Sequence, residues 1–82
     1  MIAIKVRMFA MLRDCTGAGE LRISLADSPT IDRLFENLIS SYPGLKQWQA
    51  HVRFAVNNEY VGREHILLEN DEVALIPPVS GG

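Results

Sequence analysis

Residues 31–42 have the sequence Ile-Asp-Arg-Leu-Phe-Glu-Asn-Leu-Ile-Ser-Ser-Tyr, and this stretch determines how the chain of 82 residues folds. Apolar residues recur in it at steps of three and four, which places them on one face of an amphipathic helix. Burying six such side chains stabilises a fold by on the order of 9–18 kcal/mol before chain entropy is subtracted. We therefore expect this helix to make the largest single contribution to the core. Its apolar face consists of Ile31, Leu34, Phe35, Leu38, Ile39 and Tyr42.

The segments beside this helix mark its two ends. At the start, either Ser28 or Thr30 can act as the cap, because both side chains can accept a hydrogen bond from the first turn. At the end, the Pro-Gly pair at 43–44 terminates the helix. Residues 45–51 then form a short irregular or helical crossover.

Two strand patterns precede the helix. Residues 2–9 and 20–25 alternate between apolar and polar side chains, so we expect two half-buried strands that pair antiparallel through a short connection. One helical turn fits residues 10–15 within that connection. Phe9 departs from the alternation because it falls on the face of Lys5 and Arg7.

Three further strands are predicted after the crossover, over residues 53–57, 60–61 and 72–76. The element order is then β-β-α-β-(β)-β, which indicates an α+β domain of two layers. One main helix packed across a mixed four- to five-stranded sheet is the β-grasp, or ubiquitin-like, fold. We expect residues 1–76 to form this domain, with a core of Ile4, Val6, Ile23, Leu34, Phe35, Leu38, Val56, Val73 and Leu75.

Composition excludes several classes of function. The net charge of −2 comes from eight basic and ten acidic residues that are scattered along the chain, which argues against nucleic acid or a membrane surface as the partner. No apolar run approaches the roughly 18 residues of a membrane span, and the N-terminus lacks the apolar block of a signal peptide. The single Cys15 rules out an internal disulfide and a four-cysteine metal or iron–sulfur site. A cytoplasmic location fits these features best.

The chain ends with Pro77-Pro78-Val79-Ser80-Gly81-Gly82, which we expect to form an extended tail over residues 77–82. The two prolines hold the backbone extended and cannot continue a sheet ladder. Gly81 and Gly82 lack a Cβ, so they can thread a channel too narrow for side chains. A random chain ends in two glycines roughly once in 200. Because a frayed terminus does not need a rigid base, we favour a functional tail over a frayed one.

Side chains offer few candidates for chemistry, and no metal site is expected. His51 and His65 belong to no catalytic or metal motif, and we assign them surface or structural roles. Cys15 has no positioned base beside it, which favours an unreactive thiol. The acidic segment 69–72 is either a docking patch or, as we favour, a solvated turn. The remaining unusual group is the α-carboxylate of Gly82.

The Gly82 carboxylate is ionised at pH 7, and an anion is a poor acyl donor. It therefore needs activation, and the simplest route is adenylation with ATP by another protein. A sulfur nucleophile or an amine can then attack the acyl-adenylate. We expect this chain to bind no cofactor tightly itself.

Four segments resemble the small, sulfur-carrier subunit of molybdopterin synthase, which belongs to the ubiquitin-like sulfur carriers. They are Phe9-Ala10-Met11-Leu12-Arg13-Asp14, Pro29-Thr30-Ile31, residues 55–61 (Ala-Val-Asn-Asn-Glu-Tyr-Val) and residues 71–82, which end in Pro-Pro-Val-Ser-Gly-Gly. The resemblance runs nearly from end to end, and the terminal segment is its most specific part. One position departs from the family pattern: Asn70 stands where the family usually has Gly. Asn also tolerates a left-handed backbone.

The resemblance implies a reaction in which this chain is the sulfur-donating subunit of a two-subunit enzyme and has no side-chain active site of its own. An E1-like adenylyltransferase activates Gly82 with ATP, and sulfur from a donor protein then replaces one carboxylate oxygen to give a thiocarboxylate. The tail enters the large subunit and gives its sulfur to cyclic pyranopterin monophosphate during molybdenum cofactor biosynthesis. The large and small subunits are expected to form a heterotetramer with two copies of each.

Strand parity also predicts a docking surface for these partners. Phe9 and Ile76 fall on the face opposite the core residues of their strands, and Tyr60 sits where the family carries an apolar contact residue. We expect these three to form an exposed apolar patch and to bind the partner together with the tail residues Pro77, Pro78, Val79 and Ser80. The alternative is that a loop or the crossover covers the patch.

Three other functions fit a β-grasp domain with a Gly-Gly end. The chain could carry sulfur for thiamine or another thiolated product, it could be a protein modifier that is joined to lysines through Gly82, or it could be a binding module without chemistry. The Pro77-Pro78 pair and the chain length favour the molybdopterin synthase subunit, because the thiamine-pathway carrier is usually shorter and lacks the two prolines.

Overall fold

The computed structural model describes residues 1–78, and residues 79–82 lie outside the described part. Helices and strands occur where the sequence pattern predicts them, and the short connections are also partly helical. In chain order the elements are β1 (Ile2–Met8), α1 (Ala10–Thr16), β2 (Glu20–Leu25), α2 (Ile31–Ser41), the 3₁₀ helix η1 (Pro43–Trp48), β3 (Arg53–Val56), β4 (Glu59–Val61) and β5 (Glu72–Ile76).

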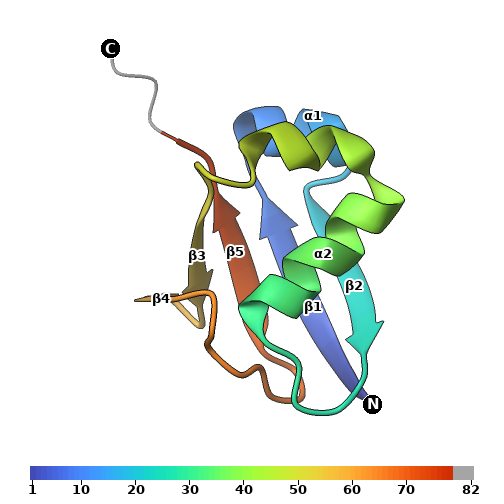
Figure 1. The fold of residues 1–82 in the computed structure, drawn as a ribbon, viewed down its shortest axis with the longest axis vertical. Coiled ribbons are helices and arrows are strands. Elements are labelled where there is room, and N and C mark those ends of the chain that lie inside the picture. Colours follow the sequence, from blue (N-terminus) through green and yellow to red (C-terminus); the bar gives the residue numbers. More distant parts are fainter. Residues whose placement is uncertain (79–82) are drawn as a thin grey trace.

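The five strands form one mixed sheet in the order β2-β1-β5-β3-β4. The central pair β1 and β5 is parallel, and the other three pairs are antiparallel. Helix α2 crosses one face of this sheet, while α1 and η1 lie together near the end where β1 and β5 finish (Figure 1). This arrangement confirms the predicted β-grasp fold. Within residues 1–78, no helix covers the opposite face of the sheet (Figure 1).

Helix α2 is the centre of the core, as its apolar face predicts. Thr30, rather than Ser28, is the cap, and its Oγ1 accepts a hydrogen bond of 3.2 Å from the backbone N–H of Arg33. The four residues of the first three turns that face the sheet are fully buried, namely Ile31, Leu34, Phe35 and Leu38. Ile39 and Tyr42, nearer the end, are partly buried. The helix stops at Ser41, and Pro43 starts η1 instead of an irregular segment.

Eight of the nine predicted core residues are buried, and Ile23 is the exception. Ile23 points inward but is only partly buried, because β2 is an edge strand with a neighbour on one side. Several buried residues were not predicted, because they lie in short helices, loops or strand ends where no periodic pattern marks the inward positions. They include Leu12, Leu45, Val52 and Leu67, whereas Met8 is buried in phase with Ile4 and Val6 of β1.

The turn before β5 is a structural junction, which corrects the prediction of a solvated acidic turn. Asp71 is buried, and its carboxylate accepts hydrogen bonds from the backbone N–H of Leu68 (2.8 Å) and from Asn57 Nδ2 (3.0 Å). Asn57 Oδ1 in turn accepts a bond from the N–H of Glu72. Asn57, Asn58 and Asn70 all have positive φ, between 50° and 73°, as expected for Asn in tight turns. The network ties the β3–β4 hairpin to the start of β5.

Replacement of Leu38 by Ala should destabilise the domain by about 2–5 kcal/mol, because Leu38 is fully buried between α2 and the sheet and the substitution leaves a cavity. Chemical denaturation monitored by circular dichroism measures this change. The exposed Asn37 on the same helix provides the matched control, and Asn37→Ala should change the stability by no more than about 0.5 kcal/mol. Equal stability of the two variants would contradict the central role of α2.

Candidate functional site: the base of the tail and the open sheet face

The tail leaves the sheet at the end of β5. Ile76 forms the last ladder pair of β5, opposite Arg53 of β3, and Pro77 and Pro78 follow it as partly buried residues. A proline nitrogen carries no hydrogen to donate, so the ladder cannot continue past Ile76. Gly81 and Gly82, together with Val79 and Ser80, lie outside the described residues. The N-terminus is at the opposite end of the molecule from the end of β5 (Figure 1).

The strand register arranges the open face of the sheet in rows. Ala55 pairs with Tyr60 on one side and with Ala74 on the other, and Ala74 pairs with Arg7. The next row, at the tail end of the sheet, contains Arg53 and Ile76. Because paired residues share a face, the small side chains of Ala55 and Ala74 lie between the larger ones. This face is therefore shallow in the centre and apolar toward the tail.

Phe9 joins this surface from the end of β1. Met8 pairs with Leu75, so Phe9 and Ile76 are the next residues of two neighbouring parallel strands. Immediately afterwards the chain turns through Ala10, whose φ of 50° lies in the left-handed region, and enters α1. The Phe9 ring remains 43% exposed, and the guanidinium carbon of Arg7 lies 5.9 Å from its centroid. The sharp turn thus keeps an aromatic ring on the surface.

Of the three residues predicted for the docking patch, two are exposed and one is not. Tyr60 is 67% exposed and Phe9 is 43% exposed. Ile76, which was predicted to be exposed, is partly buried. The reason is that its strand β5 lies in the middle of the sheet, between β1 and β3. Phe9 and Ile76 lie at the tail end of the sheet, whereas Tyr60 lies in the row before it, opposite Ala55. No loop or crossover buries the rings of Phe9 and Tyr60 in the described part of the chain.

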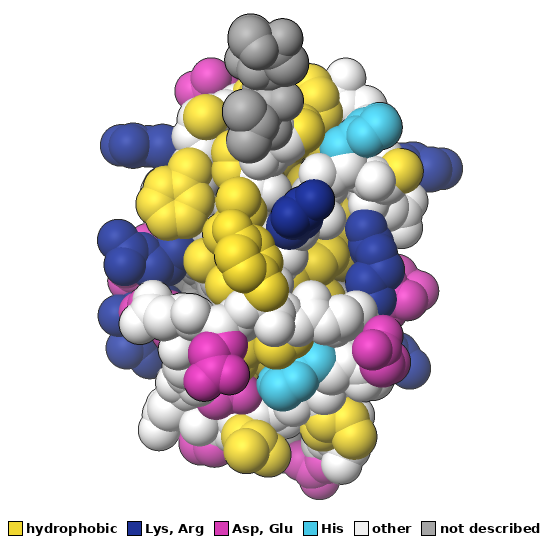
Figure 2. All heavy atoms as spheres, turned by 90° about the vertical axis from the view of Figure 1, so that its left-hand side faces the viewer, with side chains coloured by type: hydrophobic (Ala, Val, Ile, Leu, Met, Phe, Trp, Pro, Cys, Tyr) yellow, Lys and Arg dark blue, Asp and Glu magenta, His cyan; other side chains and the backbone are white. Residues whose placement is uncertain are grey.

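A hollow lies beside the base of the tail, next to this patch. Its lining comes from crossover residues 50–52, Arg53 of β3, Tyr60 of β4, and Ile76, Pro77 and Pro78. Hydrophobic side chains run down the middle of this side of the molecule, with a basic side chain beside them (Figure 2). The presence of Arg53 and His51 in this hollow was not predicted. The alternation along β3 places the side chain of Arg53 on the outer face, but its neighbours depend on the register between β3 and β5.

The other half of the open face is charged. Lys5 lies 3.8 Å from Glu72 and 3.9 Å from Glu20, and Arg7 lies 3.8 Å from Glu72. These exposed pairs contribute little to stability. The positive charges on β1 and the negative charges on β2 and β5 nevertheless neutralise one another. At the end of the sheet away from the tail, the N-terminal ammonium of Met1 donates to Asp27 and lowers the pKa of that carboxyl.

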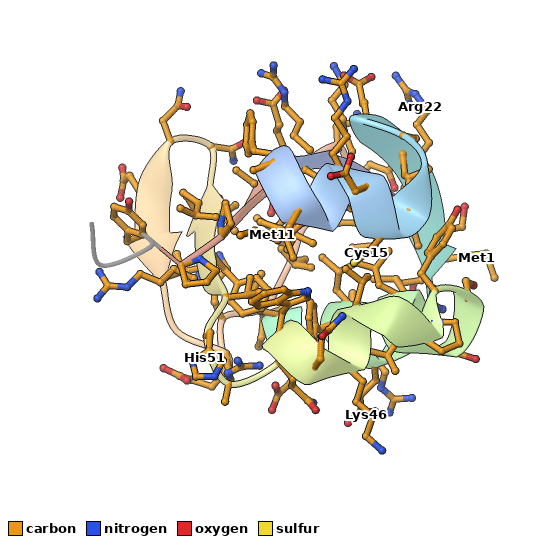
Figure 3. The ribbon with its side chains drawn as sticks, turned by 90° about the horizontal axis from the view of Figure 1, so that it is seen from above. Met1, Met11, Cys15, Arg22, Lys46 and His51 are labelled. Carbon is orange, nitrogen blue, oxygen red and sulfur yellow. The ribbon has the colours of Figure 1, made fainter. Side chains whose placement is uncertain are left out.

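The other candidate side chains do not form a site. The side chain of Cys15 extends from α1 toward η1, and its Sγ lies 3.8 Å from the carbonyl oxygen of Gly44. His51 lies apart from it (Figure 3). His51 is exposed and His65 is partly buried. Among residues 1–78 no group of three His, Cys, Asp or Glu side chains is placed to hold a metal ion. No helix in this described part is long and apolar enough to span a membrane.

Comparison with known proteins gives one family and a set of similar chains. Residues 6–82 match the ThiS family. The chain is 38% identical to the molybdopterin synthase sulfur carrier subunit of Chlamydomonas reinhardtii, over 96% of this chain and 98% of that one. It is 35% identical to the proteins of the same name from Arabidopsis thaliana, over 99% and 84% of the two chains, and from Escherichia coli, over 96% and 99%.

Solved structures agree on the fold. A protein from Pyrococcus furiosus described as putative molybdopterin converting factor, subunit 1 superimposes with a TM-score of 0.88 and 29% identity, over 96% of this chain and all of that one. The small archaeal modifier protein 1 from Methanosarcina acetivorans superimposes with a TM-score of 0.84 and 28% identity, over all of this chain and 98% of that one. The similarity in both cases extends over the whole domain.

Proposed function

Since the chain belongs to the ThiS family, we propose that it is the sulfur-carrier subunit of a molybdopterin synthase. The observation that supports this most strongly is end-to-end similarity, at 35–38% identity, to proteins that bear that name. The structure adds a physical reason. Pro77 and Pro78 follow the central strand β5 directly, and the sequence then continues to the Gly-Gly pair.

The chemistry that we propose takes place at the Gly82 carboxylate. One carboxylate oxygen attacks the α-phosphorus of ATP on an E1-like adenylyltransferase, and pyrophosphate leaves. Hydrosulfide released by a donor protein then attacks the acyl carbon, and AMP leaves with the electron pair of the bond that breaks. The product is a thiocarboxylate, in which sulfur has replaced one oxygen. Because ATP is bound by the activating enzyme, this chain needs no cofactor of its own.

The partner of the charged carrier is the large subunit of the synthase. We propose that Phe9, Tyr60 and Ile76 dock on that subunit while the tail residues Pro77, Pro78, Val79 and Ser80 enter its active site, where Gly82 gives sulfur to cyclic pyranopterin monophosphate. Docking converts the delivery of sulfur from a bimolecular encounter into a local reaction. The catalytic side chains belong to the large subunit, and two copies of each chain assemble as a heterotetramer. We place the reaction in the cytoplasm.

A second candidate function is protein modification, in which an amine attacks the activated Gly82. The structural similarity to small archaeal modifier protein 1 from Methanosarcina acetivorans supports this second function. The two functions share the adenylation step and differ in the nucleophile that follows. We prefer sulfur transfer because several relatives with that name reach 35% identity or more, whereas the modifier protein is 28% identical.

Intact-mass measurement separates these functions. Protein isolated from sulfur-replete cells should show a fraction whose mass has increased by the exchange of one oxygen for sulfur, and tandem mass spectrometry should place the change on Gly82. The thiocarboxylate should disappear when the isolated carrier is mixed with the large subunit and cyclic pyranopterin monophosphate. Lysine-linked conjugates without thiocarboxylate would support the modifier function instead. An unmodified chain under all conditions would refute both.

A further inference from the structure

Arg53 differs from Lys5 and Arg7 on its own sheet face and from the nearby Arg63, because no carboxylate of the described residues pairs with it. Lys5 and Arg7 on the same sheet face are within 4 Å of Glu72. The guanidinium of Arg63 lies 3.3 Å from Asp32 Oδ1 and also donates a hydrogen bond to the backbone carbonyl of Gln49 in the crossover. Arg53 is exposed and makes no such contact within residues 1–78.

The hollow around Arg53 has a composition that fits a particular ligand. Its lining is mixed, because Val52, Ile76 and the two prolines are apolar, whereas Arg53 and His51 supply hydrogen-bond donors and Tyr60 adds a hydroxyl. No Asp or Glu lies among the described residues that line it. A guanidinium fork matches the two oxygens of a carboxylate.

We propose that Arg53 receives an acidic side chain of the large subunit, and that this contact fixes how the tail base is oriented on that subunit. The inference rests on the proposed function, because it names a contact within the same docking surface. Two features favour this occupant. The hollow is continuous with the apolar patch through Tyr60 and Ile76, so a chain seated on the patch also covers Arg53. Its charge is complementary only to an anionic group.

The position of Arg53 explains why such a contact matters. Arg53 is the ladder partner of Ile76, the residue from which the tail departs. A bidentate ion pair at this point fixes both the direction and the register of the strand end. The reacting carbon of Gly82 lies six residues further along the chain, so a small rotation at Ile76 moves it by several ångströms. Arg53 is thus a positioning residue and not a catalytic one.

Charge reversal at Arg53 tests the proposal. The affinity of the full-length chain for the purified large subunit is measured at low and high salt for the wild type, Arg53→Gln, Arg53→Lys and Arg53→Glu. We expect Arg53→Gln to weaken binding about tenfold and Arg53→Glu about 100-fold at low salt. Arg53→Lys should fall between the wild type and Arg53→Gln, because it keeps the charge but loses the fork. The salt dependence of the Gln variant should be weaker than that of the wild type.

Arg22 provides the matched control. It is exposed on β2, at the opposite edge of the same sheet, and like Arg53 it has no ion-pair partner among the described residues. Arg22→Glu changes the net charge by the same amount, so it should reproduce any general electrostatic effect but not the specific loss. Thermal melts of both Glu variants should match the wild type, since both side chains are exposed.

The outcomes distinguish the inference from the function on which it depends. If the wild-type chain is not captured by the large subunit, the proposed function fails and the inference fails with it. If the wild type is captured and Arg53→Glu binds as well as Arg22→Glu, only the inference is overturned. Arg53 could instead bind the Gly82 carboxylate of its own chain, and Arg53→Glu would then be captured as well as the wild type or better. That result would reject the large subunit as the source of the carboxylate.

Discussion

Deletion of Gly82 should nearly abolish sulfur transfer while leaving the folded domain unchanged. The shortened chain ends in Gly81, whose carboxylate is chemically similar, so a purely chemical requirement is still met. The acyl carbon is nevertheless displaced by about 3.4 Å, the length of one extended residue. A misplacement of about 1 Å can reduce the rate of a positioned reaction on the order of 100-fold. The ATP–pyrophosphate exchange rate and the rate of sulfur transfer to the pterin measure the two steps.

Two companion variants separate length from chemistry. One extra residue after Gly82 should be as damaging as the deletion, because the carboxylate again misses the reacting position. Gly81→Ala keeps the length but adds a Cβ that would press on a narrow channel, so it should impair the reaction while the thermal melt stays the same. All three changes come after Ile76, the last residue of β5, in the sequence. A near-native rate of sulfur transfer by either length variant would show that the tail is not a delivery arm of fixed length.

The sequence predicted the helix layer and the sheet layer of this fold because apolar residues repeat at a different spacing in each. The apolar face of α2 recurs at helical spacing, and β1 and β2 alternate, so the buried positions of these elements followed from counting residues. Short elements carry no such signal. Leu45 in η1 is fully buried without a periodic pattern around it, and Leu67 in the loop before β5 is buried between the exposed Ile66 and Leu68. Tertiary packing alone determines their burial.

The surroundings of the tail were predictable only in part, for a related reason. Parity placed Phe9, Tyr60 and Ile76 on the open face, but parity does not give the register between β3 and β5. That register sets Arg53 opposite Ile76 and makes the strand end partly buried. Likewise, the three acidic residues of the last turn suggested a solvated segment. The carboxylate of Asp71 instead satisfies the backbone N–H of Leu68, a role that depends on the loop conformation.

The docking patch is best tested at its two exposed aromatic rings. Phe9→Lys and Tyr60→Lys together should reduce the affinity for the large subunit by at least about 30-fold, which corresponds to the ~2 kcal/mol or more of an interface hot spot. The physical reason is that each lysine would place a charged group where an aromatic side chain is desolvated on docking. Ile76 is less suitable for this test, because its partial burial in the sheet means that a lysine would also disturb the fold. Surface plasmon resonance with the large subunit measures the change.

A control for this experiment exists at the other end of the sheet. Leu68 is 67% exposed, the same fraction as Tyr60, but it lies in the loop that leads into β5, away from the tail. Leu68→Lys removes one apolar side chain with the same exposed fraction as Tyr60 and adds one positive charge, so it is matched to Tyr60→Lys alone and should bind the large subunit as the wild type does. All three substitutions should leave the circular-dichroism melt nearly unchanged, because they alter exposed side chains. Equal loss of binding at both ends would mean that charge, and not the apolar patch beside the tail, controls docking. Full retention of binding by the double variant would place the interface on another surface, and the tail would then have to reach its acceptor without help from Phe9 and Tyr60.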